Sequence, residues 1–253
     1  MIKGVDFSHW TGKIDFAKLI PHGIEFAIFK AGEIPTKSKM EFLDGMYQRN
    51  IREAKAHGII SGAYYFFHPA IGASRQARHF CNIMTMYGKP GLPPVIDAEV
   101  TDNMKPADCA KVLKAMIDYM VSHGSRQPII YTRNGLWVNQ YGNPDWGAEH
   151  LFWLAQYNVS LTHQDPKIKK NVIMWQYTDR LKLPGIGAAL DGNYWLGSED
   201  YLYELAGIGD YGDIVAPKPP IKADPYKRAW VIWKRLMGRE NDPFFGMRRN
   251  RSL

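Results

Sequence analysis

The most constraining feature of this sequence is an alternation of short apolar runs with longer amphipathic stretches through its first half. The apolar runs have the length and composition of buried strands and cover residues 2–7, 26–31, 59–67 and 95–100. Three amphipathic segments, each followed directly by glycine, have helical periodicity and cover residues 40–57, 73–87 and 106–123. Strands separated by helices of this length predict βαβ units and a parallel sheet.

The second half contains apolar runs without convincing helices between them. Four more strands are expected, at residues 129–132, 152–157, 172–177 and 190–194. Eight strands with about three good helices predict an α/β fold in which an irregular barrel closes. The hydrophobic fraction of 45% and the charged fraction of 23% are ordinary for a soluble globular protein, so they argue against disorder.

The composition changes after Gly207. We expect a barrel domain over residues 1–207, a proline-rich linker over 208–223 and a basic aromatic tail over 224–253 that forms one helix. Residues 217–253 carry ten Lys or Arg and three acids, which accounts for the whole net charge of +7. A cationic tail suits an anionic wall polymer, an anionic membrane or nucleic acid. The alternatives are a solubilising end, or Trp230 and Trp233 packed back onto the barrel.

Neither the cysteines nor the N-terminus indicates a secreted scaffold. Cys81 and Cys109 both fall in expected helices, and two cysteines do not make a disulfide framework in 253 residues. The N-terminus lacks the apolar region of a signal peptide, and no run of 18 apolar residues predicts a membrane span. We therefore expect synthesis in the cytoplasm, with any export depending on another component.

Asp97 and Glu99 form the most informative pair of polar residues. Residues two apart on a strand share a face, so both carboxyl groups point the same way within the expected strand. Like charges this close raise one of the two pKa values, which leaves a protonated acid beside an ionised partner. A glycosidase needs such a pair. The alternative is an Asp-x-Glu sequence that binds a metal or forms a salt bridge with a loop.

Further acids and histidines follow other expected strands. Asp6 lies near the end of the first strand and Asp191 lies on the last, and these strands are neighbours in a closed barrel. We expect both acids at one rim, although each alone is equally consistent with a loop cap. His9 and His68 also lie near strand ends, but no metal-ligand spacing supports them, so polar lining is the favoured interpretation. The sequence has no nucleophile elbow, phosphate loop or dinucleotide fingerprint.

Eight ordered motifs between residues 2 and 205 together resemble glycoside hydrolase family 25, the Chalaropsis-type lysozymes that are common among bacterial and phage cell-wall lysins. The motifs are residues 4–10 (GVDFSHW), 26–31 (FAIFKA), 62–66 (GAYYF), 94–99 (PVIDAE), 130–132 (IYT), 153–157 (WLAQY), 175–178 (WQYT) and 191–193 (DGN). Two departures change loops near the expected site. Thr11 stands where the family often has Gln, and Gly32 and Ile34 flank an acid, Glu33, that the family often places in Ala-Thr-Glu-Gly.

The resemblance implies a fold and a reaction. The fold is an irregular, flattened, TIM-like β/α barrel. The reaction is hydrolysis of the β-1,4 bond between N-acetylmuramic acid and N-acetylglucosamine in peptidoglycan. Glu99 takes the family's general acid/base position, and Asp97 either stabilises the oxocarbenium ion and orients the substrate acetamido group or attacks directly. The positions that match substrate-binding residues are Asp6, Asp191, Tyr64, Tyr131, Trp153 and Gln176. No cofactor, metal or nucleic acid is expected.

Two other functions stay open from the residues alone. A barrel of this kind can bind wall glycan without turnover, as a structural protein of a phage particle, although four intact acids argue against that. A metal-dependent hydrolase would use Asp6, His9, Asp97 and Glu99. If the protein is a muramidase, it acts on the cell wall, either as an autolysin or as a phage lysin released through a holin.

Overall fold

The computed structural model describes residues 1–157, 161 and 164–208. The expected linker from residue 209 onward and the expected tail helix at 224–253 lie outside the described residues. Within the described ranges, no helix combines the length and the apolar character needed to cross a bilayer.

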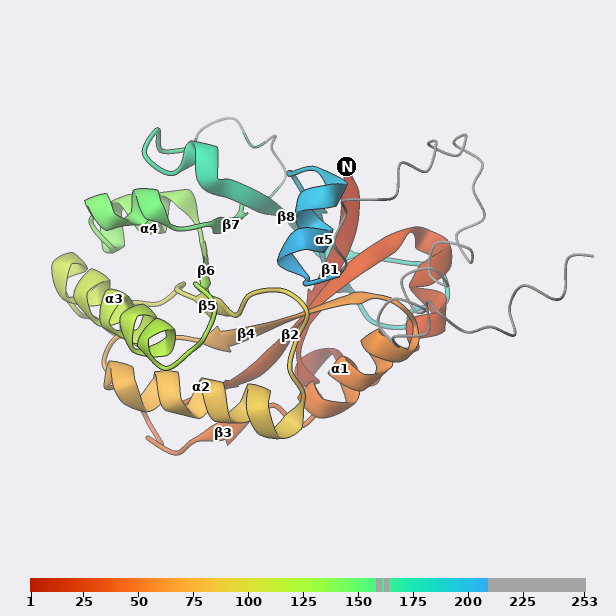
Figure 1. Cartoon of the computed structure of the whole chain (residues 1–253), viewed down its shortest axis with the longest axis horizontal. Coiled ribbons are helices and arrows are strands. Elements are labelled where there is room, and N and C mark those ends of the chain that lie inside the picture. Colours follow the sequence, from red (N-terminus) through yellow and green to blue (C-terminus); the bar gives the residue numbers. More distant parts are fainter. Residues whose placement is uncertain (158–160, 162–163, 209–253) are drawn as a thin grey trace, which may run out of the picture.

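Nine strands form one sheet in the described part of the chain, and eight of them close a barrel (Figure 1). The strands are β1 (Ile2–Phe7), β2 (Ile24–Glu33), β3 (Phe42–Leu43), β4 (Ile60–Phe66), β5 (Val95–Asp97), β6 (Ile129–Thr132), β7 (Phe152–Ala155), β8 (Val172–Leu181) and β9 (Leu190–Trp195). Their order is β1-β9-β8-β7-β6-β5-β4-β2, and β1 pairs with β2 to complete the circle. This confirms the predicted irregular barrel.

The directions of the strands explain the irregularity. β1, β2 and β4 to β8 pair in parallel, whereas β9 runs antiparallel to both of its neighbours, β8 and β1. A direct antiparallel connection from β8 to β9 needs no crossover helix. The strand ends therefore gather at one rim: the carboxyl ends of the parallel strands meet the amino end of β9.

Five α-helices accompany these strands within the described residues. They are α1 (Tyr47–Ala56), α2 (Ala73–Tyr87), α3 (Pro106–Ser122), α4 (Asn134–Gln140) and α5 (Glu199–Leu205). Short 3-10 turns occupy His9–Thr11, Phe16–Lys18, Ile20–His22, Asp145–Glu149 and Lys169–Asn171. The prediction of α2 is confirmed and that of α3 is off by one residue. The predicted start of α1 at residue 40 is wrong, because residues 42–43 instead pair with the end of β2 as strand β3.

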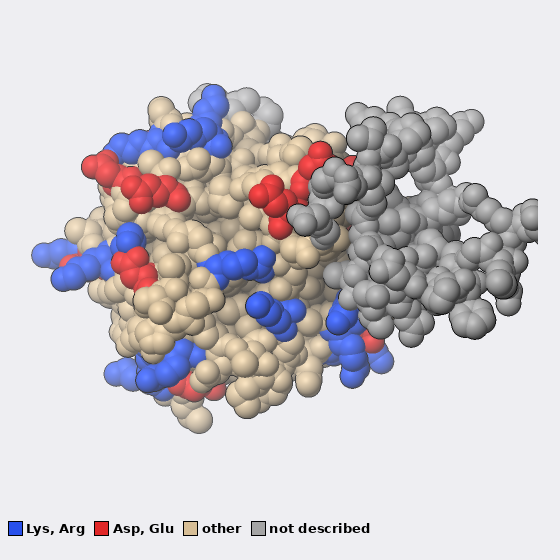
Figure 2. All heavy atoms as spheres, viewed as in Figure 1, with Lys and Arg blue, Asp and Glu red and all other residues tan. Residues whose placement is uncertain are grey.

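Charges of both signs are interspersed over the described part of the face drawn in Figure 2. The sequence agrees with this picture, because residues 1–216 balance to zero while 217–253 carry +7. The barrel therefore does not present a surface of one sign on that face.

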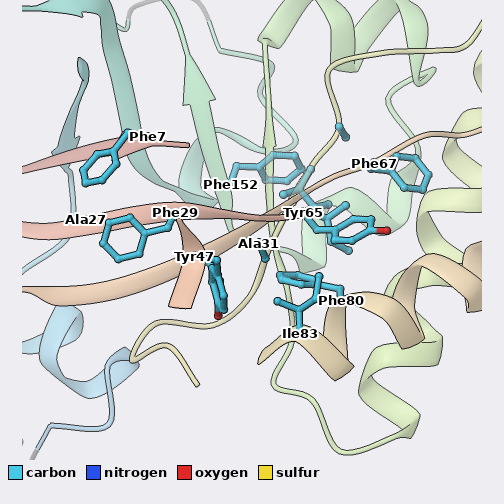
Figure 3. Packing of buried hydrophobic residues seen from close by; sticks show 14 of the residues in the cluster. Phe7, Ala27, Phe29, Ala31, Tyr47, Tyr65, Phe67, Phe80, Ile83 and Phe152 are labelled. Carbon is cyan, nitrogen blue, oxygen red and sulfur yellow. The ribbon is translucent and has the colours of Figure 1, made fainter. Parts of the chain in front are cut away.

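Two apolar cores stabilise the part of the chain that the structure describes. The larger core lies between the barrel and helices α1 to α4 and includes Phe29, Tyr65 and Phe80, which Figure 3 labels. The smaller core fills the barrel interior, where every second residue of a strand points inward. Its members are Phe26, Ile28, Ile60, Leu92, Val95, Ile129, Tyr131, Trp153, Ala155, Ile173, Met174, Trp195, Leu202, Tyr203, Ala206 and Ile208. Because α5 contributes to this interior core, polar side chains inside the barrel are confined to the opposite rim.

Candidate active site

A pocket of about 210 Å³ opens at the rim where the parallel strands end. It is lined by Asp6, Tyr64, Asp97, Glu99, Tyr131, Trp153, Tyr157, Gln176 and Asp191. All eight site residues expected from the sequence therefore lie in one pocket, although they come from positions 6 to 191. Tyr157 is the additional lining residue, and its place in the WLAQY motif was the available signal.

The strand that carries the carboxyl pair is shorter than expected. β5 ends at Asp97, so the predicted strand over residues 95–100 is wrong in its second half. The chain nevertheless continues beside β6, because the Ala98 amide donates to the Tyr131 carbonyl (2.9 Å) and the Thr132 hydroxyl donates to the Ala98 carbonyl (2.8 Å). These two bonds direct Glu99 into the same pocket as Asp97.

Asp97 is buried, and the described residues satisfy it only partly. It is 5% exposed, and its Oδ1 accepts no hydrogen bond from the described residues. Burial and then the charge of Glu99 raise the pKa of Asp97, and the Lys30 ammonium opposes this rise. A buried carboxylate oxygen without a donor costs free energy. Asp97 is thus prepared to accept a hydrogen bond from a bound molecule.

Glu99 lies nearer to solvent and holds its proton more strongly than an exposed glutamate. Burial raises its pKa, while the cations of Arg133 and Lys30 oppose the rise. Asp97 and Glu99 interact, so the pair loses its two protons in separate steps. Between those steps the pair holds one proton, which is the state that a general acid with an ionised partner requires.

Asp6 and Asp191 form a second carboxyl pair, directly opposite each other between β1 and β9. Asp6 Oδ2 accepts hydrogen bonds from Gln176 Nε2 (2.8 Å) and Asn193 Nδ2 (2.7 Å). Burial and the charge of Asp191 raise the pKa of Asp6, and burial raises the pKa of Asp191 to about 6. This pair also retains a proton above the usual pH range of aspartate.

Amide and aromatic side chains fix the floor of the pocket. Gln176 Oε1 accepts from the hydroxyls of Tyr131 (2.8 Å) and Tyr157 (2.5 Å). Trp153 Nε1 donates to Asn193 Oδ1 (2.8 Å), and the amide nitrogen of Asn193 donates to Asp6 Oδ2. Each amide thus uses its oxygen on an aromatic donor and its nitrogen on Asp6. Asn193 was missed by sequence reasoning, although it lies in the DGN motif.

His9 and His68, the two histidines expected near strand ends, have different partners. His9 Nδ1 lies 2.6 Å from Asp44 Oδ2, and His9 is not among the described pocket residues. His68 Nε2 lies 3.2 Å from Glu33 Oε2, and His68 Nδ1 lies 3.0 Å from Asp102 Oδ1. The alternative metal set, which included His9, is therefore not brought together. Among the described residues, no three His, Cys, Asp or Glu side chains are grouped to hold a metal ion.

A barrel whose strand ends place four carboxyl groups in one open pocket has the arrangement that carboxylate-based glycosidases use. The chain belongs to the glycosyl hydrolases family 25, whose family model matches residues 5–186, and it is a glycoside hydrolase. It is 28% identical over 219 residues to lysozyme M1 of Streptomyces globisporus, covering 81% of this chain and 71% of that protein.

Solved structures agree with this assignment. The bacterial lysozyme of Streptomyces coelicolor matches with a TM-score of 0.72 and 26% identity, over 81% of this chain and 96% of that one. A family 25 glycosyl hydrolase of Bacillus anthracis matches with a TM-score of 0.68 and 30% identity, over 81% and 93% of the two chains. The predicted family and fold are confirmed.

Proposed function

We propose that this protein is a lysozyme, an N-acetylmuramidase that hydrolyses the β-1,4 bond between N-acetylmuramic acid and N-acetylglucosamine in bacterial peptidoglycan. The observation that carries the proposal is the convergence of Asp6, Asp97, Glu99 and Asp191 in one pocket of a family 25 barrel. Membership of the family and the lysozyme names of relatives support the substrate. The bacterial cell wall is then the place of action, after synthesis in the cytoplasm.

Glu99 is proposed as the general acid and base. Its raised pKa and its partial exposure suit a group that gives a proton to the glycosidic oxygen as the bond to the anomeric carbon breaks. Water then attacks the anomeric carbon, and its proton returns to Glu99. The enzyme therefore ends the cycle in its starting protonation state.

Asp97 is proposed to stabilise the positive charge that develops on the sugar. Its Oδ1 accepts no hydrogen bond from the part of the chain that the structure describes, so it suits the N–H of the substrate acetamido group. The carbonyl oxygen of that group would attack the anomeric carbon as the glycosidic bond breaks, and water would then displace it. That hydrogen bond favours the ionised form of Asp97 and leaves the shared proton on Glu99. Direct attack by Asp97 is the competing route.

The other pocket residues are proposed to bind the glycan. Asp191 and the hydroxyl-bearing rings offer hydrogen-bond partners for sugar hydroxyl and acetamido groups. Asp6 accepts hydrogen bonds from two amide donors, which hold its carboxyl group in the lining of the pocket. The set proposed for substrate binding is Asp6, Asp191, Tyr64, Tyr131, Trp153 and Gln176.

The test replaces Glu99 by Gln and measures reducing-end release from purified peptidoglycan, with the products identified by mass spectrometry. Loss of general-acid help lowers the rate by about 10²–10⁴-fold, while the melting temperature stays near that of the wild type. Glu204→Gln, an exposed change on α5, is the matched control and keeps full activity. Wild-type protein that binds peptidoglycan without releasing muropeptides would instead indicate a non-catalytic wall-binding protein of a phage particle.

We also propose that residues 224–253 attach the enzyme to an anionic wall polymer or membrane. The proposal is supported by the charge of +7 on residues 217–253, set against a balanced remainder. Nucleic acid is not expected as the partner, because the barrel belongs to a glycan-cleaving family.

A further inference from the structure

A chain of four charged side chains lies beside the pocket and takes no part in the reaction as proposed. Lys30 Nζ lies 2.7 Å from Glu33 Oε1, and Glu33 Oε2 lies 3.2 Å from His68 Nε2. His68 Nδ1 lies 3.0 Å from Asp102 Oδ1, and the second oxygen of Asp102 accepts from the Ala70 amide (3.1 Å). Lys30 and His68 are only 7% and 9% exposed. We call Lys30, Glu33, His68 and Asp102 the charged chain.

A β-bulge places the first two members on one face of β2. Lys30 lies opposite Tyr64 and Glu33 lies opposite Phe66, with a register shift between residues 30 and 32. Tyr64 and Phe66 are two residues apart and share a face of β4, whereas residues three apart on a regular strand face opposite sides. The extra residue of the bulge therefore turns Glu33 toward the face that carries Lys30.

The Lys30 end of the charged chain acts on the carboxyl pair. The positive charge of Lys30 lowers the pKa of both Asp97 and Glu99 against the effect of burial. The geometry agrees, because the Lys30 ammonium lies 4.9 Å from the centroid of the Phe66 ring, and Phe66 lies opposite Asp97 between β4 and β5. The Lys30 ammonium therefore contributes to how easily Asp97 ionises, against burial and the charge of Glu99.

The other end of the charged chain keeps His68 protonated. Burial lowers the pKa of His68, but its hydrogen bonds to Glu33 and Asp102 outweigh burial and raise it above the usual value. The hydrogen bond from His68, followed by the contact with Lys30, lowers the pKa of Glu33 to about 2 although burial opposes this. With all four groups ionised, the charged chain is neutral.

The elements packed around His68 fix its place. Glu33 faces it from β2 and Asp102 faces it from the segment between β5 and α3. From α2, the neutral amide of Gln76 accepts from the His68 amide (3.0 Å) and donates to the His68 carbonyl (2.9 Å). The Phe66 ring lies beside the imidazole, with ring centroids 5.1 Å apart.

We propose that protonated His68 is a positioning residue for the carboxyl pair, which holds Glu33 and, through Glu33, the Lys30 ammonium beside Asp97. The proposal rests on the proposed lysozyme activity, because Asp97 and Glu99 are its acids. If His68 loses its charge, the charged chain changes from neutral to −1. The potential at Asp97 then becomes more negative, and Asp97 ionises only at higher pH.

The test is the pH dependence of kcat and KM in His68→Gln, with His79→Gln as the matched control. His79 is also buried (8% exposed), but it lies on α2 and bonds the Tyr65 hydroxyl, away from the pocket. In His68→Gln, the acid limb of the pH profile of kcat shifts to higher pH by about 0.5–1 unit. At a pH on that limb, kcat is therefore about 3–10-fold lower, and KM changes little. His79→Gln lowers the melting temperature and leaves the limb in place. His68→Arg keeps a cation between two carboxylates and moves the limb back toward its wild-type position.

Two results would overturn the proposal. One is a fall in kcat by the same factor at every pH in His68→Gln, which indicates a structural role alone. The other is an NMR titration in which the His68 ring of the wild-type protein is neutral at pH 6, because a neutral imidazole is not a positioning cation. This measurement needs no variant, so it decides the question even if His68→Gln does not fold. Wild-type protein that does not cleave glycan refutes the proposed function, and the NMR titration still decides the charge of His68.

Discussion

At the scale of single residues, the pocket keeps carboxyl groups where their charge is unfavourable. Burial raises the pKa of Asp191 to about 6, above its usual value of about 4. An acid whose pKa is raised by folding contributes stability below its unfolded pKa, and that contribution is lost as pH rises through the folded pKa. The free energy of unfolding should therefore fall between about pH 4 and pH 6 on account of this residue.

Asp191→Asn removes that unfavourable charge. At pH 7 we expect the free energy of unfolding to rise by roughly 1–2 kcal/mol, a figure reduced for the residue's partial exposure, and we expect no rise at pH 4. Glycan cleavage should fall, since the residue lines the pocket. Urea unfolding at both pH values is the measurement, with Asp118→Asn on the surface of α3 as control. Equal stabilisation at both pH values would show that burial of the charge is not the cause.

At the scale of elements, the periodicity of the sequence located all eight barrel strands but not every boundary. Short apolar runs identify these strands because a parallel barrel strand under helices is buried on both faces, as β5, β6 and β7 are. The start of α1 was wrong because Phe42 and Leu43 pair with β2, and a two-residue pairing depends on neighbours distant in sequence. Helices α4 and α5 have seven residues each, too few to show a helical period.

The candidate site was predictable where it depends on strand ends and motifs. Asp6 and Asp191 were expected at one rim because the first and last strands of a closed barrel are neighbours, and they do lie opposite each other. The charged chain was not predictable. It requires the bulge that turns Glu33, and a bulge arises from the register of β2 against β4, which no local pattern in β2 records.

Gly4 on β1 tests how closely the strands pack inside the barrel. A Cβ atom at this position would lie 2.3 Å from the Phe26 ring, whereas at Gly45 it would meet nothing within 4 Å. We expect Gly4→Ala to lower the free energy of unfolding by about 1–3 kcal/mol and Gly45→Ala to change it by less than about 0.5 kcal/mol. Thermal or denaturant unfolding measures both. Adding Phe26→Leu to Gly4→Ala should recover part of the loss, and strictly additive effects would contradict the proposed contact.

At the scale of the whole molecule, the charge is divided between two parts of the chain. Residues 1–216 balance to zero, and both signs are interspersed on the described face in Figure 2, so the barrel has little reason to bind polyanions in general. Residues 217–253 carry +7. Recognition of the glycan at the pocket and attraction to an anionic surface are therefore separable by truncation.

Truncation after Ala216 should leave cleavage of soluble glycan fragments within about two-fold of the full chain, because the pocket residues all precede this point. Binding of the full chain to intact cells should weaken steeply with salt, whereas the truncated protein should bind weakly at all salt concentrations. A full-length variant distinguishes attraction by charge from hydrophobic packing of the tail. In it, Gln replaces four basic residues: Lys227, Arg228, Lys234 and Arg235. If it binds as the truncated protein does, charge attaches the tail. If both proteins bind cells like the wild type and only the truncation lowers the melting temperature, Trp230 and Trp233 stabilise the barrel instead and the attachment proposal is wrong.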